Sequence, residues 1–194
     1  LQLRRKDPKM SGPIGAPASA PRKPLIGLTG RRFRMGLIEG AHPGYGQRLT
    51  DAFFTDFADR ITRAGGVPVF IPSDERNNFI PTSHDIAARV TRRTKAIILT
   101  SPSNPNGSVW SREQLQFVAD LAVSHPFYVV SDEIYEKLIY DGQKHVSIAE
   151  LGEAIKNQTF VVNGMSKAYA MTGWRIGYVA GPRVEICAMT SFQS

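Results

Sequence analysis

Short apolar runs recur along this chain of 194 residues and predict strands that alternate with helices. Each run has about the length of a buried strand and is bounded by Gly, Pro, Ser, Thr or Asn. Strands that are separated by helices favour parallel pairing. The sequence therefore predicts an α/β fold with a mostly parallel sheet and flanking helices. The predicted strands are residues 25–28, 67–71, 96–100, 127–130, 160–162 and 175–180.

The segments between the runs carry helix signals. In residues 50–64, three phenylalanines and Ile61 fall on one face at helical spacing, which is typical of a core face. Ser111, with Gln114 three residues later, has the pattern of a capping box. Residues 31–46 are rich in Gly, and we expect irregular structure there. The predicted helices are residues 50–64, 83–90, 111–123 and 148–156, with a last one from residue 182 onward.

The composition changes along the chain and suggests three regions. Residues 1–24 are rich in Pro, Gly, Ala, Lys and Arg, which predicts a disordered basic tail. Residues 25–71 form a short βαβ-like segment. Residues 72–194 contain the clearer strand–helix alternation. In the strand at 67–71, Pro68 favours an edge position in the sheet or an early end of the strand.

The charge of the chain is unevenly distributed. The net charge is +7, but the excess of basic residues lies in residues 1–34, and the remainder is close to neutral. No basic face with interleaved aromatic residues accompanies the tail, so we expect no nucleic-acid partner. There is no apolar run of membrane-spanning length and no signal-peptide pattern. We therefore expect no membrane partner and a cytoplasmic location.

Cysteine and histidine residues give no sign of a metal site. Cys187 is the single cysteine, which excludes a disulfide framework, and it lies in a predicted helix, where we expect it to be packed rather than nucleophilic. The four histidines have no ligand spacing, and we expect surface or loop positions for them. They are His42, His84, His125 and His145.

Polar groups follow three of the predicted strands. Asn104 comes after the strand at 96–100, Asp132 and Tyr135 after the next, and Lys167 after the third; Arg175 opens the fourth. The carboxyl ends of parallel strands form the ligand crevice of an open α/β sheet. We therefore expect an amide, a carboxylate, a phenol, an amine and a guanidinium at one cleft.

These five groups match the chemical needs of pyridoxal 5′-phosphate. A lysine forms a Schiff base with its aldehyde, and a carboxylate keeps its pyridine nitrogen protonated. A phenol and an amide suit its ring hydroxyl, and an arginine suits its phosphate. Taken alone, each residue has a simpler explanation: a turn for Asn104, a cap of a helix over 133–138 for Asp132, core for Tyr135, a loop lysine in water for Lys167, and pairing with a surface acid for Arg175.

Three ordered motifs surround these residues: SPSNPNG at 101–107, SDEIYE at 131–136 and NGMSKAYAMTGWRIG at 163–177. Together they resemble the class I/II aminotransferases of fold type I, and their bacterial aspartate aminotransferase branch in particular. The resemblance runs from about Gly65 to Ser194. It implies a partial large domain that binds pyridoxal phosphate as its cofactor. It also implies an amino acid and a 2-oxo acid as substrates, and the homodimer that is usual in the family.

The resemblance also implies a role for each candidate residue. Lys167 would be the catalytic lysine, which binds the cofactor covalently and moves the substrate proton. Asp132 would pair with the pyridine nitrogen, Asn104 and Tyr135 with the ring hydroxyl, and Arg175 with the phosphate. Many family members carry a phosphate-binding serine three positions before the lysine, where this chain has Gly164.

The sequence departs from the family's pattern at both ends. We find no Gly-rich phosphate turn or ring-stacking aromatic residue before Gly65, and no small domain with an arginine for the substrate carboxylate. We therefore expect a truncated aminotransferase. The alternative is a non-catalytic fragment or chimera with at most residual binding of pyridoxal phosphate.

A second, shorter resemblance concerns residues 23–72. KPLIGLTGRR at 23–32 and AGGVPVFIP at 64–72 resemble the start of class I glutamine amidotransferase-like γ-glutamyl hydrolases. This resemblance implies a chimera with a join near residues 64–72. Those enzymes need a cysteine on a nucleophile elbow, and Cys187 has no glycine flanks, so hydrolase activity is the least favoured function.

Overall fold

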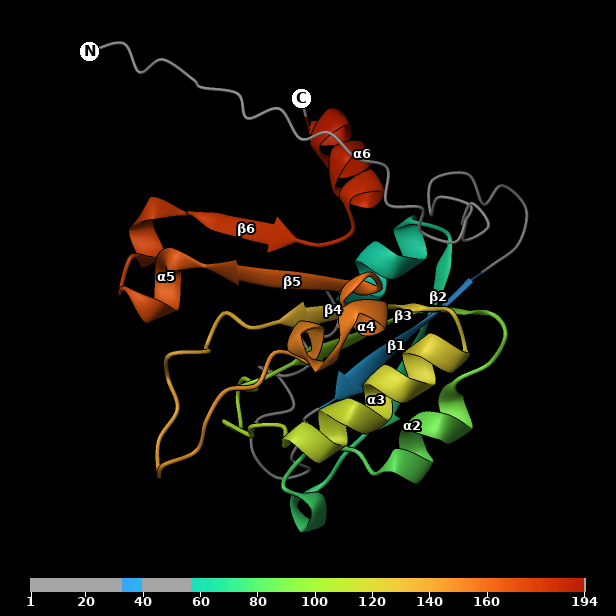
Figure 1. Cartoon of the computed structure of the whole chain (residues 1–194), viewed down its shortest axis with the longest axis horizontal. Coiled ribbons are helices and arrows are strands. Elements are labelled where there is room, and N and C mark those ends of the chain that lie inside the picture. The colour runs from blue at the N-terminus through green and yellow to red at the C-terminus, as the bar shows by residue number, and fades with distance from the viewer. Residues whose placement is uncertain (1–32, 40–56, 194) are drawn as a thin grey trace, which may run out of the picture.

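The computed structural model describes residues 33–39 and 57–193, which form a six-stranded sheet (Figure 1). The strand order is β2-β1-β3-β4-β5-β6. The first five strands pair in parallel, and β6 runs antiparallel to β5. The predicted α/β class with a mostly parallel sheet is confirmed. The strands are β1 (Phe33–Glu39), β2 (Gly66–Pro72), β3 (Thr94–Thr100), β4 (Tyr128–Asp132), β5 (Thr159–Gly164) and β6 (Gly177–Ala180).

Helices connect most of these strands. The predicted helix at 148–156 is interrupted, because Gly152 adopts φ 153°, and the segment forms two short pieces instead of one. The helices predicted at 83–90 and 111–123 are confirmed. The helical elements are residues 57–63, η1 (Glu75–Asn77), α2 (Ser83–Arg89), α3 (Arg112–Ser124), η2 (Ile148–Leu151), α4 (Glu153–Lys156), α5 (Met165–Ala168), η3 (Thr172–Trp174) and α6 (Arg183–Gln193).

The strand β1 corrects the expectation of irregular structure at 31–46. It lies inside the sheet, between β2 and β3. Its Gly36 is buried, and a Cβ there would lie 3.2 Å from Ile97 Cγ1 and 3.3 Å from Ile71 Cδ1. The glycine that suggested a loop therefore serves close packing between neighbouring strands. The strand predicted at 25–28 lies outside the described residues.

The helices α2, α3 and α4 lie on the same face of the sheet (Figure 1). Ile97 and Leu99 of β3 and Val129 of β4 belong to one buried cluster with Leu115 and Val118 of α3. Each of these side chains is at most 1% exposed. Burying a side chain of this kind stabilises the fold by about 1.5–3 kcal/mol. At one edge of the sheet lies β2 with its Pro68, as predicted.

Side chains form hydrogen bonds to free backbone groups at both the start and the end of α3. At the start, Ser111 Oγ accepts the Gln114 N–H while Gln114 Oε1 accepts the Ser111 N–H, so the predicted capping box is confirmed. At the end, the carbonyl of Ala122 has no helical donor, because the residue four positions later is Pro126. The buried Gln158 Nε2 donates to this carbonyl at 2.9 Å.

The outermost part of the described fold, β6 and α6, packs more loosely. The hydroxyl of Tyr128 in β4 donates to the carboxylate of Glu185 in α6, but Val184 is 72% and Phe192 is 90% exposed. Cys187 is helical as predicted but exposed, so the expectation that it is packed is wrong. None of the helices in the described part of the chain is long and apolar enough to cross a membrane.

Candidate active site

The carboxyl ends of three neighbouring strands are level with one another. Asp132, the last residue of β4, stands opposite Thr100 of β3 and Val162 of β5. Two backbone hydrogen bonds continue the ladder beyond this point, from Ser101 N to the Asp132 carbonyl (3.1 Å) and from Glu133 N to the Val162 carbonyl (2.9 Å). The segments that follow β3, β4 and β5 therefore leave the sheet at one common edge.

The start of β6 meets this same edge. Since β6 is antiparallel to β5, its first residue, Gly177, pairs with Gly164 at the end of β5. Met165 N donates to the Ile176 carbonyl at 3.1 Å. Figure 1 shows α5 and the start of β6 together at the end of the sheet toward which β4 and β5 point. Arg175 thus enters from the edge that also carries Lys167 of α5.

The structure brings two of the predicted residues into contact. Lys167 Nζ lies over the ring of Tyr135, 5.4 Å from its centroid, in cation–π geometry. Both side chains are half-buried, so Tyr135 is not a core residue. Lys167 forms no ion pair with any of the described residues, which leaves its amine uncommitted.

Asn104 and Arg175 are more open than Tyr135 and Lys167. Asn104 is exposed in the turn after β3, and neither residue is hydrogen-bonded to Asp132, Tyr135 or Lys167 in the described structure. Arg175 is exposed with φ 55°, and its Nη1 donates to the Thr172 carbonyl at 3.3 Å. This single hydrogen bond to a carbonyl leaves the other N–H groups of the guanidinium available to an anion.

Asp132 has a shifted pKa at this edge of the sheet. Burial raises the pKa of its carboxyl, and the negative charge of Glu133 adds to this rise, while the bond from Ile134 N–H to Asp132 Oδ1 (3.1 Å) opposes it. The alternative explanation, a cap for a helix over 133–138, is wrong, because residues 134–137 form turns. Among the described residues, Asp132 Oδ2 accepts no hydrogen bond.

Gly164 has a steric reason to lack a side chain. A Cβ at this position would lie 2.7 Å from the Ile176 carbonyl oxygen and 3.1 Å from Gly177 Cα. Both are backbone atoms: Gly177 is the first residue of β6, and the Ile176 carbonyl accepts the Met165 N–H, so neither can move aside cheaply. A serine at this position would therefore not fit this backbone.

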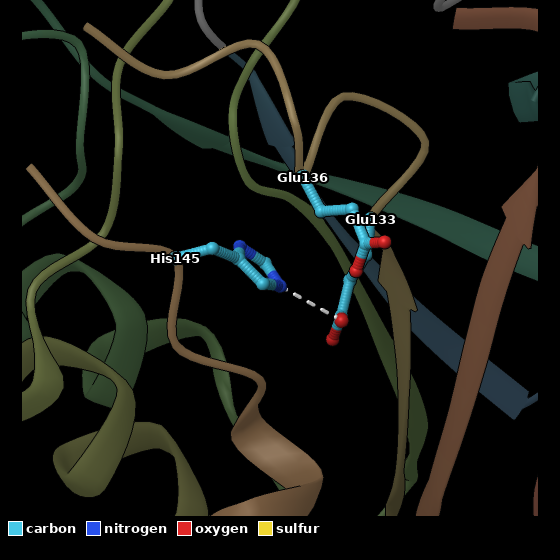
Figure 2. A group of neighbouring side chains, drawn as sticks. All are labelled: Glu133, Glu136 and His145. Carbon is cyan, nitrogen blue, oxygen red and sulfur yellow. Dashed lines mark hydrogen bonds and ion pairs between the residues drawn. The ribbon is translucent and has the colours of Figure 1, made fainter. Parts of the chain in front are cut away.

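A buried network behind Asp132 was not predicted. Glu133 is 3% exposed, and its Oε1 accepts the hydroxyls of Ser131 (2.9 Å) and Ser147 (2.7 Å). Its Oε2 lies 2.9 Å from His145 Nε2 (Figure 2). His145 was expected at the surface or in a loop; it lies in the irregular segment before η2, with a side chain that is only 15% exposed. The one signal in the sequence was a second carboxylate directly after Asp132 at the end of a buried strand.

Figure 2 shows that the carboxylate of Glu136 approaches the same place. One ligand atom each from Glu133, Glu136 and His145 lie within 4.8 Å of one another. Hydrogen bonds from Ser131, Ser147 and His145 already account for the buried carboxylate of Glu133. The absence of a metal site stays a prediction.

Comparisons with known proteins agree on one family. The profile of the family "Aminotransferase class I and II" matches residues 46–194. Aspartate aminotransferase of Geobacillus stearothermophilus is 47% identical over 142 residues, which are 73% of this chain and 36% of that protein. Aspartate aminotransferase of Pyrococcus abyssi is 42% identical over 175 residues, which are 89% of this chain and 45% of that protein.

Solved structures give the same result. An aromatic aminotransferase from Pyrococcus horikoshii superposes with a TM-score of 0.73 at 37% identity, over 84% of this chain and 40% of that one. Aspartate aminotransferase from Thermus thermophilus with maleate gives a TM-score of 0.69 at 38% identity, over 83% of this chain and 38% of that one.

The extent of these matches adds two facts. The chain spans less than half the length of the relatives that it matches. The family profile begins at residue 46, earlier than the start near Gly65 that the motifs suggested. The join near residues 64–72 stays a hypothesis. With the profile covering most of its length and relatives above 40% identity, this chain belongs to the class I and II aminotransferase family.

Proposed function

We propose that this chain binds pyridoxal 5′-phosphate at the common strand edge and takes part in amino-group transfer between an amino acid and a 2-oxo acid. The observation that carries the proposal is the half-buried carboxylate of Asp132, level with the ends of β3 and β5, on the edge where Lys167 lies over Tyr135. When bound, the cofactor supplies an aldehyde and an electron-withdrawing pyridine ring.

The residues present suit this cofactor. Asp132 Oδ2 accepts no hydrogen bond from the described part of the chain, so it is open to a protonated ring nitrogen. Burial raises the pKa of this carboxyl, which strengthens its hydrogen bond to a cationic partner, and the cation in turn stabilises the carboxylate. The Asn104 amide and the Tyr135 hydroxyl are donors for a ring hydroxyl. Arg175 offers a bidentate fork for a phosphate.

Lys167 is the catalytic residue of the proposal. Its amine contacts an aromatic face instead of a carboxylate, so no strong ion pair must be broken before it reacts. A neutral lysine amine is a nucleophile toward an aldehyde and also a base. In the proposed reaction, Lys167 Nζ accepts the proton from the α-carbon of the amino-acid substrate.

The decisive experiment is covalent labelling of the purified chain. Pyridoxal phosphate is added, the product is reduced with borohydride, and the peptides are analysed by mass spectrometry. We expect the added mass on the peptide that contains Lys167, and none on that segment in Lys167→Ala. Lys156→Ala, which removes an exposed lysine of α4, is the matched control and keeps the label. A wild-type chain without label at Lys167 contradicts the proposal.

Turnover separates the full proposal from its alternative. Aspartate is the first amino acid to test, because several relatives carry the name aspartate aminotransferase. Formation of a new amino acid from an added 2-oxo acid, measured by chromatography, supports an active transferase. Labelling at Lys167 without turnover supports the alternative, a non-catalytic chain that retains cofactor binding.

A further inference from the structure

Asp132 and Glu133 are consecutive carboxylates with opposite environments. Successive side chains of an extended strand point to opposite faces, so Glu133 shares its face with Ser131, not with Asp132. The hydrogen bond from Ser131 Oγ to Glu133 Oε1 agrees with this arrangement. Asp132 is half-buried at the proposed cofactor edge, whereas Glu133 is buried on the side that η2 covers.

Glu133 is held at every polar group that it carries. Its N–H donates to the Val162 carbonyl (2.9 Å), and its carbonyl accepts from Glu136 N (2.9 Å). Its carboxylate accepts two hydroxyls, from Ser131 and Ser147, and contacts His145 Nε2. The side chain thus connects the end of β4 to the segment that precedes η2, and this fixes the backbone from which Asp132 projects.

The imidazole of His145 meets the Glu133 carboxylate through its Nε2 atom, at 2.9 Å. Its Nδ1 is buried and has no hydrogen-bond partner among the described residues. A proton there would leave a buried N–H unsatisfied, which is costly, so we assign the donor role in the contact with Glu133 to Nε2. Glu133 is thus in contact with three donors, the hydroxyls of Ser131 and Ser147 and His145 Nε2. The negative charge of Glu133 contributes to the raised pKa of the neighbouring Asp132 carboxyl, after the larger effect of burial.

We propose that Glu133 is a positioning residue, which holds Asp132 toward the cofactor ring from the opposite face of β4 through Ser131, Ser147 and His145. This inference rests on the proposed function for its consequence in cofactor binding. Its structural part, the coupling of Glu133 to Asp132, concerns the cofactor-free chain as well. At metal sites, residues that hold a metal-binding side chain in place change metal affinity or activity by about 10- to 100-fold when they are removed, and we expect an effect of this order for the cofactor.

Two measurements on the full chain test the proposal. The pKa of Asp132 is measured by ¹³C NMR of the labelled carboxyl in the cofactor-free protein. The dissociation constant of pyridoxal phosphate is measured by absorbance titration. Glu133→Gln keeps the shape of the side chain but removes its charge, so we expect a lower pKa of Asp132 and a dissociation constant raised about tenfold.

Glu136→Gln is the matched control. Glu136 lies three residues further along and approaches the same group, but it is not bonded to Ser131, Ser147 or His145 in the described structure. We expect both measured quantities to stay at their wild-type values. If they change as much in Glu136→Gln as in Glu133→Gln, the assignment to Glu133 is wrong.

Folding of each variant is checked by thermal unfolding without cofactor. If Glu133→Gln does not fold, Ser147→Ala and His145→Gln replace it, and each is expected to raise the dissociation constant about threefold, part of the full effect. A folded Glu133→Gln with wild-type values of both quantities overturns the proposal, as do wild-type dissociation constants in both replacement variants. If wild type binds no pyridoxal phosphate, the proposed function fails. The pKa of Asp132 alone then tests the coupling of Glu133 to Asp132. A lower pKa in Glu133→Gln supports this coupling, and an unchanged pKa overturns it.

Discussion

At the scale of single residues, the ionised carboxylate of Asp132 that the proposed function needs lowers the stability of the cofactor-free fold. Because its pKa is raised in the folded chain, the folded state binds this proton more tightly than the unfolded state. The stabilising effect of the bound proton is complete below the unfolded-state pKa of about 4 and declines as the pH rises through the folded-state pKa. At neutral pH the ionised carboxylate therefore costs stability as long as no cation pairs with it.

We predict that Asp132→Asn stabilises the cofactor-free chain at neutral pH. Asparagine keeps an oxygen that accepts the Ile134 N–H but removes the half-buried charge. The gain should disappear below about pH 4, where the wild-type carboxyl is protonated in both states. Urea unfolding at a series of pH values measures this. A variant that is less stable than wild type at pH 7, or one whose difference is the same at every pH, contradicts the prediction.

Gly164 gives a steric prediction at the same scale. Gly164→Ala places a Cβ 2.7 Å from the Ile176 carbonyl oxygen, and we expect a loss of about 1–3 kcal/mol in the free energy of unfolding. The control is Gly173→Ala, since a Cβ at Gly173 meets nothing within 4 Å. The control should remain within about 0.5 kcal/mol of wild type. Equal losses in both variants would show that the contact at Gly164 is not the cause.

At the scale of elements, Gln158 joins a helix to a strand. Its Nε2 donates to the carbonyls of Ala122 at the end of α3 and Phe127 before β4, both at 2.9 Å. The first carbonyl depends on this bond because Pro126 provides no N–H. This glutamine fixes where α3 ends and how β4 enters the sheet, although it lies more than thirty residues away in sequence.

We predict that Gln158→Leu lowers the free energy of unfolding by about 1–3 kcal/mol, because buried carbonyl groups lose their donor. Gln116→Leu is the control, since Gln116 is exposed on α3 and, within the described part of the chain, its side chain bonds only Asp120 of the same helix. It should change stability by less than about 0.5 kcal/mol. Denaturant unfolding of both variants provides the comparison, and an unaffected Gln158→Leu would refute the role given to its amide.

Elements with local signals could be predicted, and those with distant causes could not. The start of α3 follows from Ser111 and Gln114, which are three residues apart and make their own contacts. By contrast, Gly36 suggested a loop, because its reason lies in Ile71 and Ile97, which only the folded sheet brings next to it. The break at Gly152 was missed for a similar reason, since helical spacing does not reveal a φ of 153°.

The candidate site shows the same division. The sequence places Asn104, Asp132 and Lys167 near the ends of three parallel strands, whose carboxyl ends meet at one edge. It placed Asp132 just past its strand, whereas Asp132 is the last residue of β4. The bond between Glu133 and His145 spans twelve residues without regular secondary structure in most of the interval. No periodic pattern encodes such a contact, so the support behind Asp132 became visible only in the structure.

At the scale of the whole molecule, the candidate site belongs to no single element. Its five residues lie at or next to the ends of four different strands, from Asn104 after β3 to Arg175 before β6. A ligand that contacts all of them binds the folded sheet and not the unfolded chain. Cofactor binding and the stability of the sheet are therefore linked.

We predict that pyridoxal phosphate at about one hundred times its dissociation constant stabilises the wild-type chain by about 2.7 kcal/mol. Thermal unfolding at several cofactor concentrations measures this as a rising midpoint. Lys167→Ala should show a much smaller rise at the same concentrations, because its affinity is lower. The prediction is contradicted if wild type is labelled at Lys167 but its thermal unfolding midpoint does not rise with cofactor. Binding would then not depend on the folded sheet.

The register of β3, β4 and β5 at this edge has a consequence for misfolded forms with a shifted strand. Asp132 stands opposite Thr100 and Val162, and a slip of one residue in β4 would turn its side chain to the other face of the sheet. Such a misaligned sheet would keep its strands, its helices and most of its circular dichroism. If the proposed function is correct, such a sheet would not bind the cofactor. The absorbance of a protein-bound pyridoxal group would then report whether β4 has its native alignment.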